Sequence, residues 1–331
     1  MINHEFPVAA DLRGDAAPSA LDLDEALRSG RNPWPVRALQ IETTSICNFR
    51  CASCPLAMPE YDRPEKHLTL DRFERILDAF PTVEKIELQG IGEVFLNPCA
   101  MELIRAAKRR KLSVHTFSNA SVFSPAVARE LVASGIDAVN LSMDGADEAT
   151  FRALRKGGTL ARYKECVTNV VEARKAAGSR TPSVGMMSVL SKRNYRQAPA
   201  MIEIAEALGM DTLIFTKLNS SANRDLESIG LGADERAWLD ALPPHPGRVV
   251  VIRAYTPWTR QERIDCAWPR SMAYVTVDGD VTPCCNYFDA RELNLGNAIE
   301  KPGAQIWNDE AYRAFRKRLW SGDLPDKCQR C

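Results

Sequence analysis

The feature that most constrains the fold is an alternation of strand-like and helix-like segments that repeats six times between residues 36 and 245. The strand-like segments are short runs rich in apolar and β-branched residues, at 36–42, 85–88, 113–117, 138–142, 183–189 and 211–216. Helical periodicity follows each one, as where Phe73, Ile76, Leu77 and Phe80 recur three or four residues apart. Sequential parallel strands need crossover helices. The pattern therefore predicts an α/β fold with a parallel sheet, either doubly wound or a partial barrel.

Several helix ends carry local signals. Ser124 followed by Pro125 predicts a helix start, and Asn97 followed by Pro98 predicts another, with Asn97 as the N-cap. Gly209 predicts the end of the helix over 198–208.

The chain changes character after residue 250. Two apolar runs, 272–277 and 281–285, flank Asp278-Gly279 and predict a hairpin, and a helix is expected over 310–320. Half of the ten cysteines fall in this last quarter. We therefore predict three parts: a leader over 1–35 with a short helix at 22–28, a main domain over 36–245, and a cysteine-organised module over 250–331.

The composition excludes several classes of partner. Lys and Arg together number 43, as do Asp and Glu, so no net basic charge points to nucleic acid or an anionic membrane. The sequence has no apolar run long enough to span a bilayer and no signal peptide pattern. We expect a cytoplasmic protein without nucleic-acid or membrane partners, whose clustered cysteines bind metal rather than form disulfides.

Three cysteines lie close together in the loop after the first predicted strand. Cys47, Cys51 and Cys54 are spaced by three and two residues, and no fourth Cys or His lies nearby. Soft thiolates select iron–sulfur clusters or zinc, but three ligands leave a structural zinc site incomplete. The spacing therefore favours an iron–sulfur cluster with one open coordination position.

This motif, followed by six strand–helix units, resembles the radical SAM superfamily. The resemblance covers residues 36–245 and implies a partial (β/α)6 TIM-like barrel. It also implies that Cys47, Cys51 and Cys54 hold a four-iron, four-sulfur cluster whose fourth iron binds S-adenosylmethionine. One-electron reduction by an external donor such as flavodoxin or ferredoxin then yields a 5′-deoxyadenosyl radical that abstracts hydrogen from a substrate.

The same resemblance implies a set of cofactor contacts. Gly90, Gly92 and Glu93, directly after the second strand, are similar to the loop that holds the methionyl ammonium. Glycine permits close backbone approach, and a carboxylate suits a cation. Contacts to the ribose and carboxylate are expected from the ends of later strands, at Ser118, Asn119, Ser142 and Arg155.

Two positions depart from the family pattern. Ser53 stands before the third cysteine, where the family usually has a bulky residue that packs on adenine, and Ile91 replaces a common glycine. The adenine contacts are therefore not assigned from the sequence.

The C-terminal module resembles the SPASM or shorter twitch extension of the family, which carries an auxiliary iron–sulfur cluster. Gly279 and Cys284, then Leu295-Gly296-Asn297, carry the resemblance. It implies one four-cysteine cluster, with a four-cysteine zinc site as the alternative. The implied ligands are Cys266, Cys284, Cys328 and Cys331.

The other three cysteines receive different interpretations. Cys166 lies on an apolar helical face and Cys99 lies near a helix start, so both are interpreted as structural. Cys285 follows an implied cluster ligand. It is interpreted either as a second-sphere residue or as a thiol that delivers a hydrogen atom.

Two reactions fit these features. In the first, which resembles the radical SAM dehydrogenases of aminocyclitols and sugars, the radical takes hydrogen from a carbinol carbon and the auxiliary cluster accepts an electron, giving a ketone. In the second, the enzyme is an epimerase of a sugar or peptide, with Cys285 as hydrogen donor. Residues 1–35 are too few for a peptide-recognition domain, which favours a small polar substrate. Candidate substrate contacts at strand ends are Glu42, Gln89, His115 and Lys217.

Overall fold

One nine-stranded sheet forms the centre of the computed structural model, which describes residues 20–220 and 223–331. The strand order is β7-β6-β5-β4-β3-β2-β1-β8-β9, and β7 and β9 are its edges. The strands are β1 (Ala38–Ile41), β2 (Lys85–Leu88), β3 (Ser113–Ser118), β4 (Ala138–Ser142), β5 (Ser183–Leu190), β6 (Thr212–Lys217), β7 (Val250–Ala254), β8 (Met272–Val275) and β9 (Val281–Thr282). Every pairing from β7 to β8 is parallel, and β9 is antiparallel to β8.

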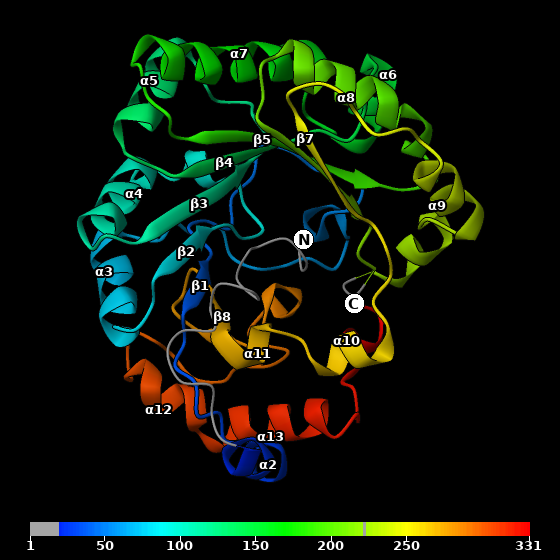
Figure 1. Cartoon of the computed structure of the whole chain (residues 1–331). Coiled ribbons are helices and arrows are strands. Elements are labelled where there is room, and N and C mark those ends of the chain that lie inside the picture. The colour runs from blue at the N-terminus through cyan, green and yellow to red at the C-terminus, as the bar shows by residue number, and fades with distance from the viewer. Residues whose placement is uncertain (1–19, 221–222) are drawn as a thin grey trace.

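The sheet curves around a common interior, and helices cover its outer face (Figure 1). The helices that follow the strands are α3 (Leu70–Ala79), α4 (Ala100–Arg109), α5 (Pro125–Ala133), α6 (Glu148–Leu154), α7 (Leu160–Ala176), α8 (Ala198–Ala207) and α9 (Ala233–Asp240). This is the predicted partial barrel, and the prediction of an α/β fold is confirmed.

Alternation along each strand separates the two faces of the sheet. Leu39, Ile86 and Val114 belong to the core that the helices cover. Their neighbours Glu87 and His115 face the barrel interior, away from that core. Burial raises the pKa of Glu87 to about 8 and lowers that of His115 to about 4. The interior is therefore polar, but it disfavours charge.

The predicted start of the second helix is wrong. Helix α4 begins at Ala100 with Cys99 at the cap position, because Asn97 is used elsewhere. The Asn97 side chain donates to the carbonyl oxygens of Thr43 (2.8 Å) and Leu68 (2.9 Å) and accepts from the Cys99 amide (2.8 Å). It therefore joins three segments near the barrel rim. The other two signals hold, since Ser124 caps α5 and Gly209, with a φ of 71°, follows α8.

The sequence analysis did not predict that β7 and β8 are parallel strands of the barrel sheet. Strand β7 pairs with β6, and β8 pairs with β1 in the register Ala38↔Met272. The hairpin around Asp278 and Gly279 is present as β8 and β9, but it continues the barrel sheet. A parallel pairing between segments more than 230 residues apart leaves no local pattern in the sequence.

The remaining helices surround the C-terminal cysteines. They are α2 (Ala20–Ser29), α10 (Arg260–Ile264), α11 (Trp268–Ser271), α12 (Gly303–Asn308), α13 (Glu310–Trp320) and α14 (Asp326–Gln329). Short 3-10 turns are η1 (Pro55–Ala57), η2 (Val94–Leu96), η3 (Tyr195–Gln197), η4 (Arg224–Ile229) and η5 (Cys285–Tyr287). The helices predicted over 22–28 and 310–320 are α2 and α13, which lie side by side (Figure 1).

The segment between α2 and β1 is held by Asn32, whose side chain is only 2% exposed. Its Nδ2 donates to the carbonyl oxygens of Arg270 (2.7 Å) and Pro269 (3.3 Å). Its backbone exchanges hydrogen bonds with the side chain of Asn308 (2.8 and 3.0 Å). The part of the predicted leader that the structure describes is thus packed against the C-terminal module. Residues 1–19 lie outside the described residues.

We predict that Asn32→Ala lowers the free energy of unfolding by about 1–3 kcal/mol, because it leaves buried carbonyl oxygens without donors. Urea denaturation followed by circular dichroism measures this change. The control is Arg31→Ala, since the Arg31 side chain is exposed, and it should change the free energy by less than about 0.5 kcal/mol. Equal effects of the two substitutions would contradict the assignment of Asn32 as a structural clamp.

Candidate active site

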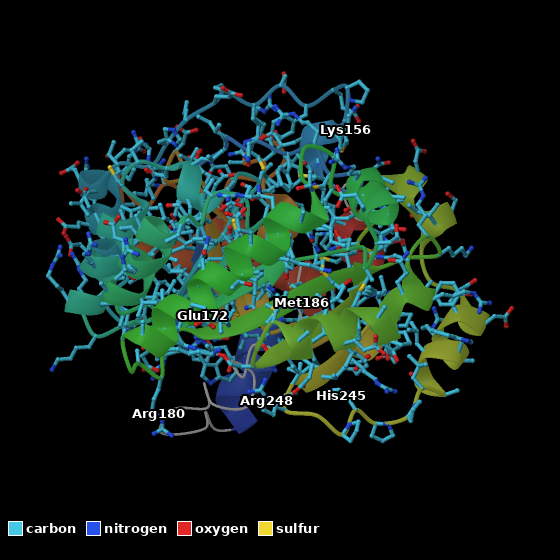
Figure 2. All side chains as sticks on the ribbon, turned by 90° about the horizontal axis from the view of Figure 1, so that it is seen from above. Lys156, Glu172, Arg180, Met186, His245 and Arg248 are labelled. Carbon is cyan, nitrogen blue, oxygen red and sulfur yellow. The ribbon has the colours of Figure 1, made fainter. Side chains whose placement is uncertain are left out.

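The Cys47–Cys54 loop lies at the carboxyl ends of the strands, where barrel enzymes place their chemistry. The Arg50 amide donates to the Lys156 carbonyl (2.8 Å) and the Ala52 amide donates to the Leu154 carbonyl (2.9 Å). Figure 2 shows Lys156 at the opposite end of the barrel from Arg180 and His245. The loop after α6 therefore fixes the backbone of the cysteine loop.

The three thiols have an environment that suits a cluster. Burial raises the pKa of Cys47 and of Cys51, and it raises the pKa of Cys54 to about 12. Neighbouring thiolates raise the pKa of Cys47 and Cys54 further. The Phe49 amide donates to Cys47 Sγ (3.4 Å). All three are free and partly exposed. Thiolates that crowd one another and receive amide hydrogen bonds fit a group that replaces their protons with iron.

Gly90 and Gly92 are required by contacts with the first strand's loop. A Cβ on Gly90 would lie 2.3 Å from Glu42 Cγ, and one on Gly92 would lie 2.3 Å from the Thr44 carbonyl oxygen. The amides of Gly92 and Glu93 donate to the carbonyl oxygens of Thr44 (3.2 Å) and Ile46 (2.9 Å). The glycines thus bring the β2 loop against the segment that leads into Cys47. Their expected contact with S-adenosylmethionine stays a prediction.

Glu93 joins the β2 loop to the end of β3. Its carboxylate accepts from Ser118 Oγ (2.8 Å), the Asn119 amide (2.7 Å) and the Phe95 amide (3.3 Å). Burial raises its pKa, and the hydrogen bonds from Asn119 and Ser118 oppose that rise. Asn119 Nδ2 also donates to Asn48 Oδ1 (2.9 Å). Three of the predicted cofactor residues therefore form one network beside the cysteine loop.

Arg155 completes the other side of this loop. Its Nε lies 2.6 Å from Asp144 Oδ2, and both side chains are buried. The charge of Arg155 lowers the pKa of Cys51 against the larger effect of burial. Ser142, the last residue of β4, lies two positions before Asp144. The structure therefore brings Arg155 to the cysteine loop, whereas the contact of Ser142 with the cofactor stays a prediction.

No role is assigned to Gly157 and Gly158 from the sequence, and the structure shows why both positions are glycines. A Cβ on Gly158 would lie 2.4 Å from the Phe49 ring, and one on Gly157 would lie 3.2 Å from Phe49 Cα. Phe49 is buried against these glycines. Its ring therefore packs against the loop that follows α6.

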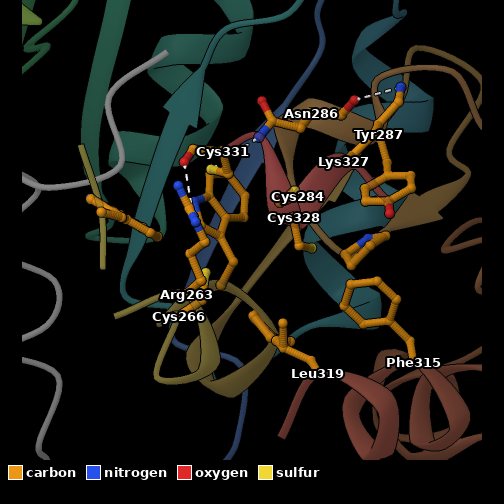
Figure 3. A pocket seen from close by; sticks show the side chains of 14 residues that line it. Arg263, Cys266, Cys284, Asn286, Tyr287, Phe315, Leu319, Lys327, Cys328 and Cys331 are labelled. Carbon is orange, nitrogen blue, oxygen red and sulfur yellow. Dashed lines mark hydrogen bonds between the residues drawn. The ribbon is translucent and has the colours of Figure 1, made fainter. Parts of the chain in front are cut away.

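The four C-terminal cysteines of the predicted auxiliary site line one pocket (Figure 3). The other walls of this pocket include the apolar side chains of Trp268, Phe315 and Leu319. The thiols come from three segments: Cys266 follows α10, Cys284 follows β9, Cys328 lies in α14 and Cys331 just after it.

The polar contacts of this pocket suit a cluster as well. Burial raises the pKa of Cys266 and Cys284, and that of Cys328 to about 12, and the neighbouring thiolates add to each shift. Asn286 Nδ2 donates to Cys331 Sγ (3.3 Å), as donors to cluster sulfurs do. Four thiols around one cavity therefore fit a cluster with a protein ligand on every iron.

Cys285 is not part of that lining. It lies in an apolar layer with Met272, Tyr274 and Phe288, against which Ile91 of the β2 loop and Cys284 of the pocket also pack. Burial raises the pKa of Cys285 to about 12, so it carries a proton at neutral pH. The layer thus lies between the two cysteine sites, with Cys285 in it.

The two predicted catalytic residues at strand ends have different surroundings. Glu42 is buried and accepts two hydrogen bonds from Arg63 (2.6 and 3.0 Å) and one from the Val277 amide (3.1 Å), so proton abstraction by Glu42 requires that pair to open. Burial lowers the pKa of Lys217, and its Nζ lies 6.0 Å from the centre of the Trp258 ring. The catalytic role of each stays a prediction.

A single metal ion would need a tighter arrangement than either cysteine site shows. In the described parts of the chain, no three Cys, His, Asp or Glu side chains converge on one point that could hold an ion. In a cluster each thiolate binds its own iron, so its ligands stand farther apart.

No helix within residues 20–220 or 223–331 is long and apolar enough to cross a bilayer.

We predict that anaerobically reconstituted protein holds about eight iron atoms per chain, and that Cys328→Ala lowers this to about four by removing one auxiliary ligand. Cys285→Ala should keep about eight, because Cys285 is outside the pocket. Iron and labile sulfide assays measure both. About four iron atoms and one zinc in the unsubstituted protein would contradict the auxiliary cluster.

Two protein families match the chain. "Radical SAM superfamily" matches residues 41–205, and "SPASM: Iron-sulfur cluster-binding domain" matches residues 266–331. Together they cover more than two thirds of the sequence.

Individual proteins show the same likeness. The "Tungsten-containing aldehyde ferredoxin oxidoreductase cofactor-modifying protein" of Pyrococcus furiosus is 28% identical over 305 residues, which is 85% of this chain and 83% of that protein.

Two solved structures share the fold. Streptococcus suis SuiB bound to precursor peptide SuiA has a TM-score of 0.69 at 15% identity, over 93% of this chain and 76% of that one. BtrN in complex with AdoMet and 2-DOIA has a TM-score of 0.51 at 15% identity, over 90% of this chain and 93% of that one. The chain therefore belongs to the radical SAM superfamily, has a C-terminal SPASM domain, and uses S-adenosylmethionine with four-iron, four-sulfur clusters.

Proposed function

We propose that this radical SAM enzyme is an oxidoreductase that converts a carbinol of a small polar substrate, an aminocyclitol or a sugar, to a ketone. The observation that carries the proposal is the pocket in which Cys266, Cys284, Cys328 and Cys331 all stand around one cavity. A cluster with a thiolate on every iron has no open position for a substrate. It is suited to accept an electron instead.

The bound cofactors supply a 5′-deoxyadenosyl radical at the first site and an electron acceptor at the second. The chain's own residues supply the pocket between them. Glu87 and His115 face the barrel interior, where burial favours their neutral forms and leaves them as hydrogen-bonding groups. Lys217 is the better base of the two candidates, because its lowered pKa increases the neutral amine and because Glu42 is tied to Arg63.

The two solved structures are described with ligands of different classes. BtrN is described with 2-DOIA, and SuiB is described with a precursor peptide. Both are about 15% identical to this chain, so they support the fold alone. The polar barrel interior favours the small polyhydroxylated class. We place the enzyme in the cytoplasm, with an external one-electron donor such as flavodoxin or ferredoxin.

A second candidate function rests on Cys285. A buried, protonated thiol in the layer between the two sites is placed to return a hydrogen atom to a substrate radical. That step would make the enzyme an epimerase of a sugar or peptide residue.

We predict that aminocyclitols and amino sugars deuterated at their carbinol carbons transfer deuterium to 5′-deoxyadenosine. Mass spectrometry of the nucleoside product measures the transfer, and the Cys47→Ala variant is the control that should form no such product. Deuterium transfer from none of these compounds, with 5′-deoxyadenosine still formed, would overturn the carbinol proposal. Absence of 5′-deoxyadenosine in the reduced protein would overturn the enzyme assignment.

Replacement of Cys285 by Ala separates the two reactions. A dehydrogenase lacking this thiol should still form ketone at a rate within about threefold of the unsubstituted enzyme. An epimerase should lose solvent deuterium incorporation into its substrate and accumulate a different product. Cys99→Ala is the matched control, since Cys99 lies outside both cysteine sites.

A further inference from the structure

Arg316 on α13 is the largest fully buried side chain among the described residues. Its Nε donates to the Pro269 carbonyl oxygen (2.7 Å), and its Nη1 donates to the Trp307 carbonyl oxygen (2.5 Å). Its guanidinium carbon lies 4.0 Å from the ring centre of Tyr312 and 4.2 Å from that of Trp307. Among the described residues, no carboxylate forms an ion pair with Arg316. The Nη2 atom of Arg316 has no hydrogen-bond partner among them.

A buried cation without a counter-ion is costly. Desolvation of one charge costs several kcal/mol even after the protein relaxes. The two aromatic faces and the carbonyl oxygens that contact the guanidinium offset only part of this cost. Burial lowers the pKa of Arg316 to about 10, so it still carries its charge at neutral pH. The folded chain therefore holds a buried positive charge that a nearby anion would stabilise.

The auxiliary pocket is the anionic site that borders Arg316. Pro269, which accepts from Arg316, lines the pocket, as do Phe315 and Leu319 from the same helix. Tyr312, in contact with the guanidinium, has its pKa raised by burial and further by the charges of Cys284 and Cys266. One layer of side chains thus lies between the guanidinium and the cysteine thiolates. Together with the cluster that they would hold, these thiolates carry a net negative charge.

We propose that Arg316 is the buried counter-charge of the auxiliary cluster and raises its reduction potential. Reduction adds one negative charge to the cluster, and a fixed positive charge stabilises the reduced state more than the oxidised state. Arg316 touches neither substrate nor iron; it acts through the cluster as a positioning residue. The inference deepens the proposed function, on which it rests for the role of this cluster as electron acceptor.

A purely structural role is the competing explanation, because the guanidinium also joins α12 and α13 to Pro269. Charge and geometry are separated by two variants. Arg316→Lys keeps the charge and loses the fork of hydrogen bonds, whereas Arg316→Gln keeps a donor and loses the charge. Lys317→Gln is the matched control, because Lys317 is exposed on the same helix.

The experiment is a potentiometric titration followed by electron paramagnetic resonance, on full-length protein that carries Cys47→Ala, Cys51→Ala and Cys54→Ala so that only the auxiliary cluster contributes. Arg316→Gln should lower the equilibrium constant for reduction about tenfold, which is a shift of about 59 mV to lower potential. Arg316→Lys should change it by less than about threefold, and Lys317→Gln should leave it unchanged.

An Arg316→Gln protein with a loaded cluster and an unchanged potential would overturn the inference. If Arg316→Gln does not load iron, the Lys variant decides: a loaded cluster at the original potential supports the charge, and failure to load iron assigns Arg316 to structure alone. None of these readouts depends on a substrate. A shifted potential together with no deuterium transfer from carbinols would overturn the proposed reaction and leave this inference standing.

Discussion

The parallel pairing of β1 with β2 on one side and β8 on the other is the constraint on which the rest of the structure depends. The register aligns Ala38 with both Lys85 and Met272, so three loops leave the sheet at the same end. The β1 loop carries Cys47, and the hairpin that β8 opens leads to Cys284. Because β9 runs back antiparallel to β8, Cys284 lies near the level of Met272 and Ala38, whereas Cys47 lies beyond the carboxyl end of β1. Hydrogen bonding across one central strand therefore places the two cysteine sites toward opposite ends of the same strands, with the layer around Cys285 between them.

Burial then determines the chemistry of what lies between those sites. The thiol of Cys285 remains protonated because the layer around it is apolar. Glu87 and His115 are shifted toward their neutral forms by the barrel interior. Arg316 keeps its charge because its usual pKa is so high that burial cannot bring it to neutrality.

Particular residues show where sequence reasoning succeeds and where it stops. The helix cap at Ser124 was predictable, because a cap depends on its own neighbours. Asn97 has the same local signal, but its side chain binds Thr43 and Leu68, which are distant in the sequence. Gly90 and Gly92 were expected to admit a ligand, and they also admit the neighbouring loop. In each of these cases a residue distant in the sequence contacts the group to which the local pattern had assigned another partner.

The sequence by itself determined the α/β class through its periodicity and the two groups of cysteines through their spacing, because both are local properties. Its resemblance to the radical SAM superfamily implied the barrel and the cofactor class. Only the tertiary structure decided that β8 joins the barrel through β1, that Cys285 is outside the auxiliary pocket, and that Arg316 is buried beside it. These facts depend on contacts between segments far apart in the chain. Such contacts are fixed by the packing of the whole core, and no spacing in the sequence records them.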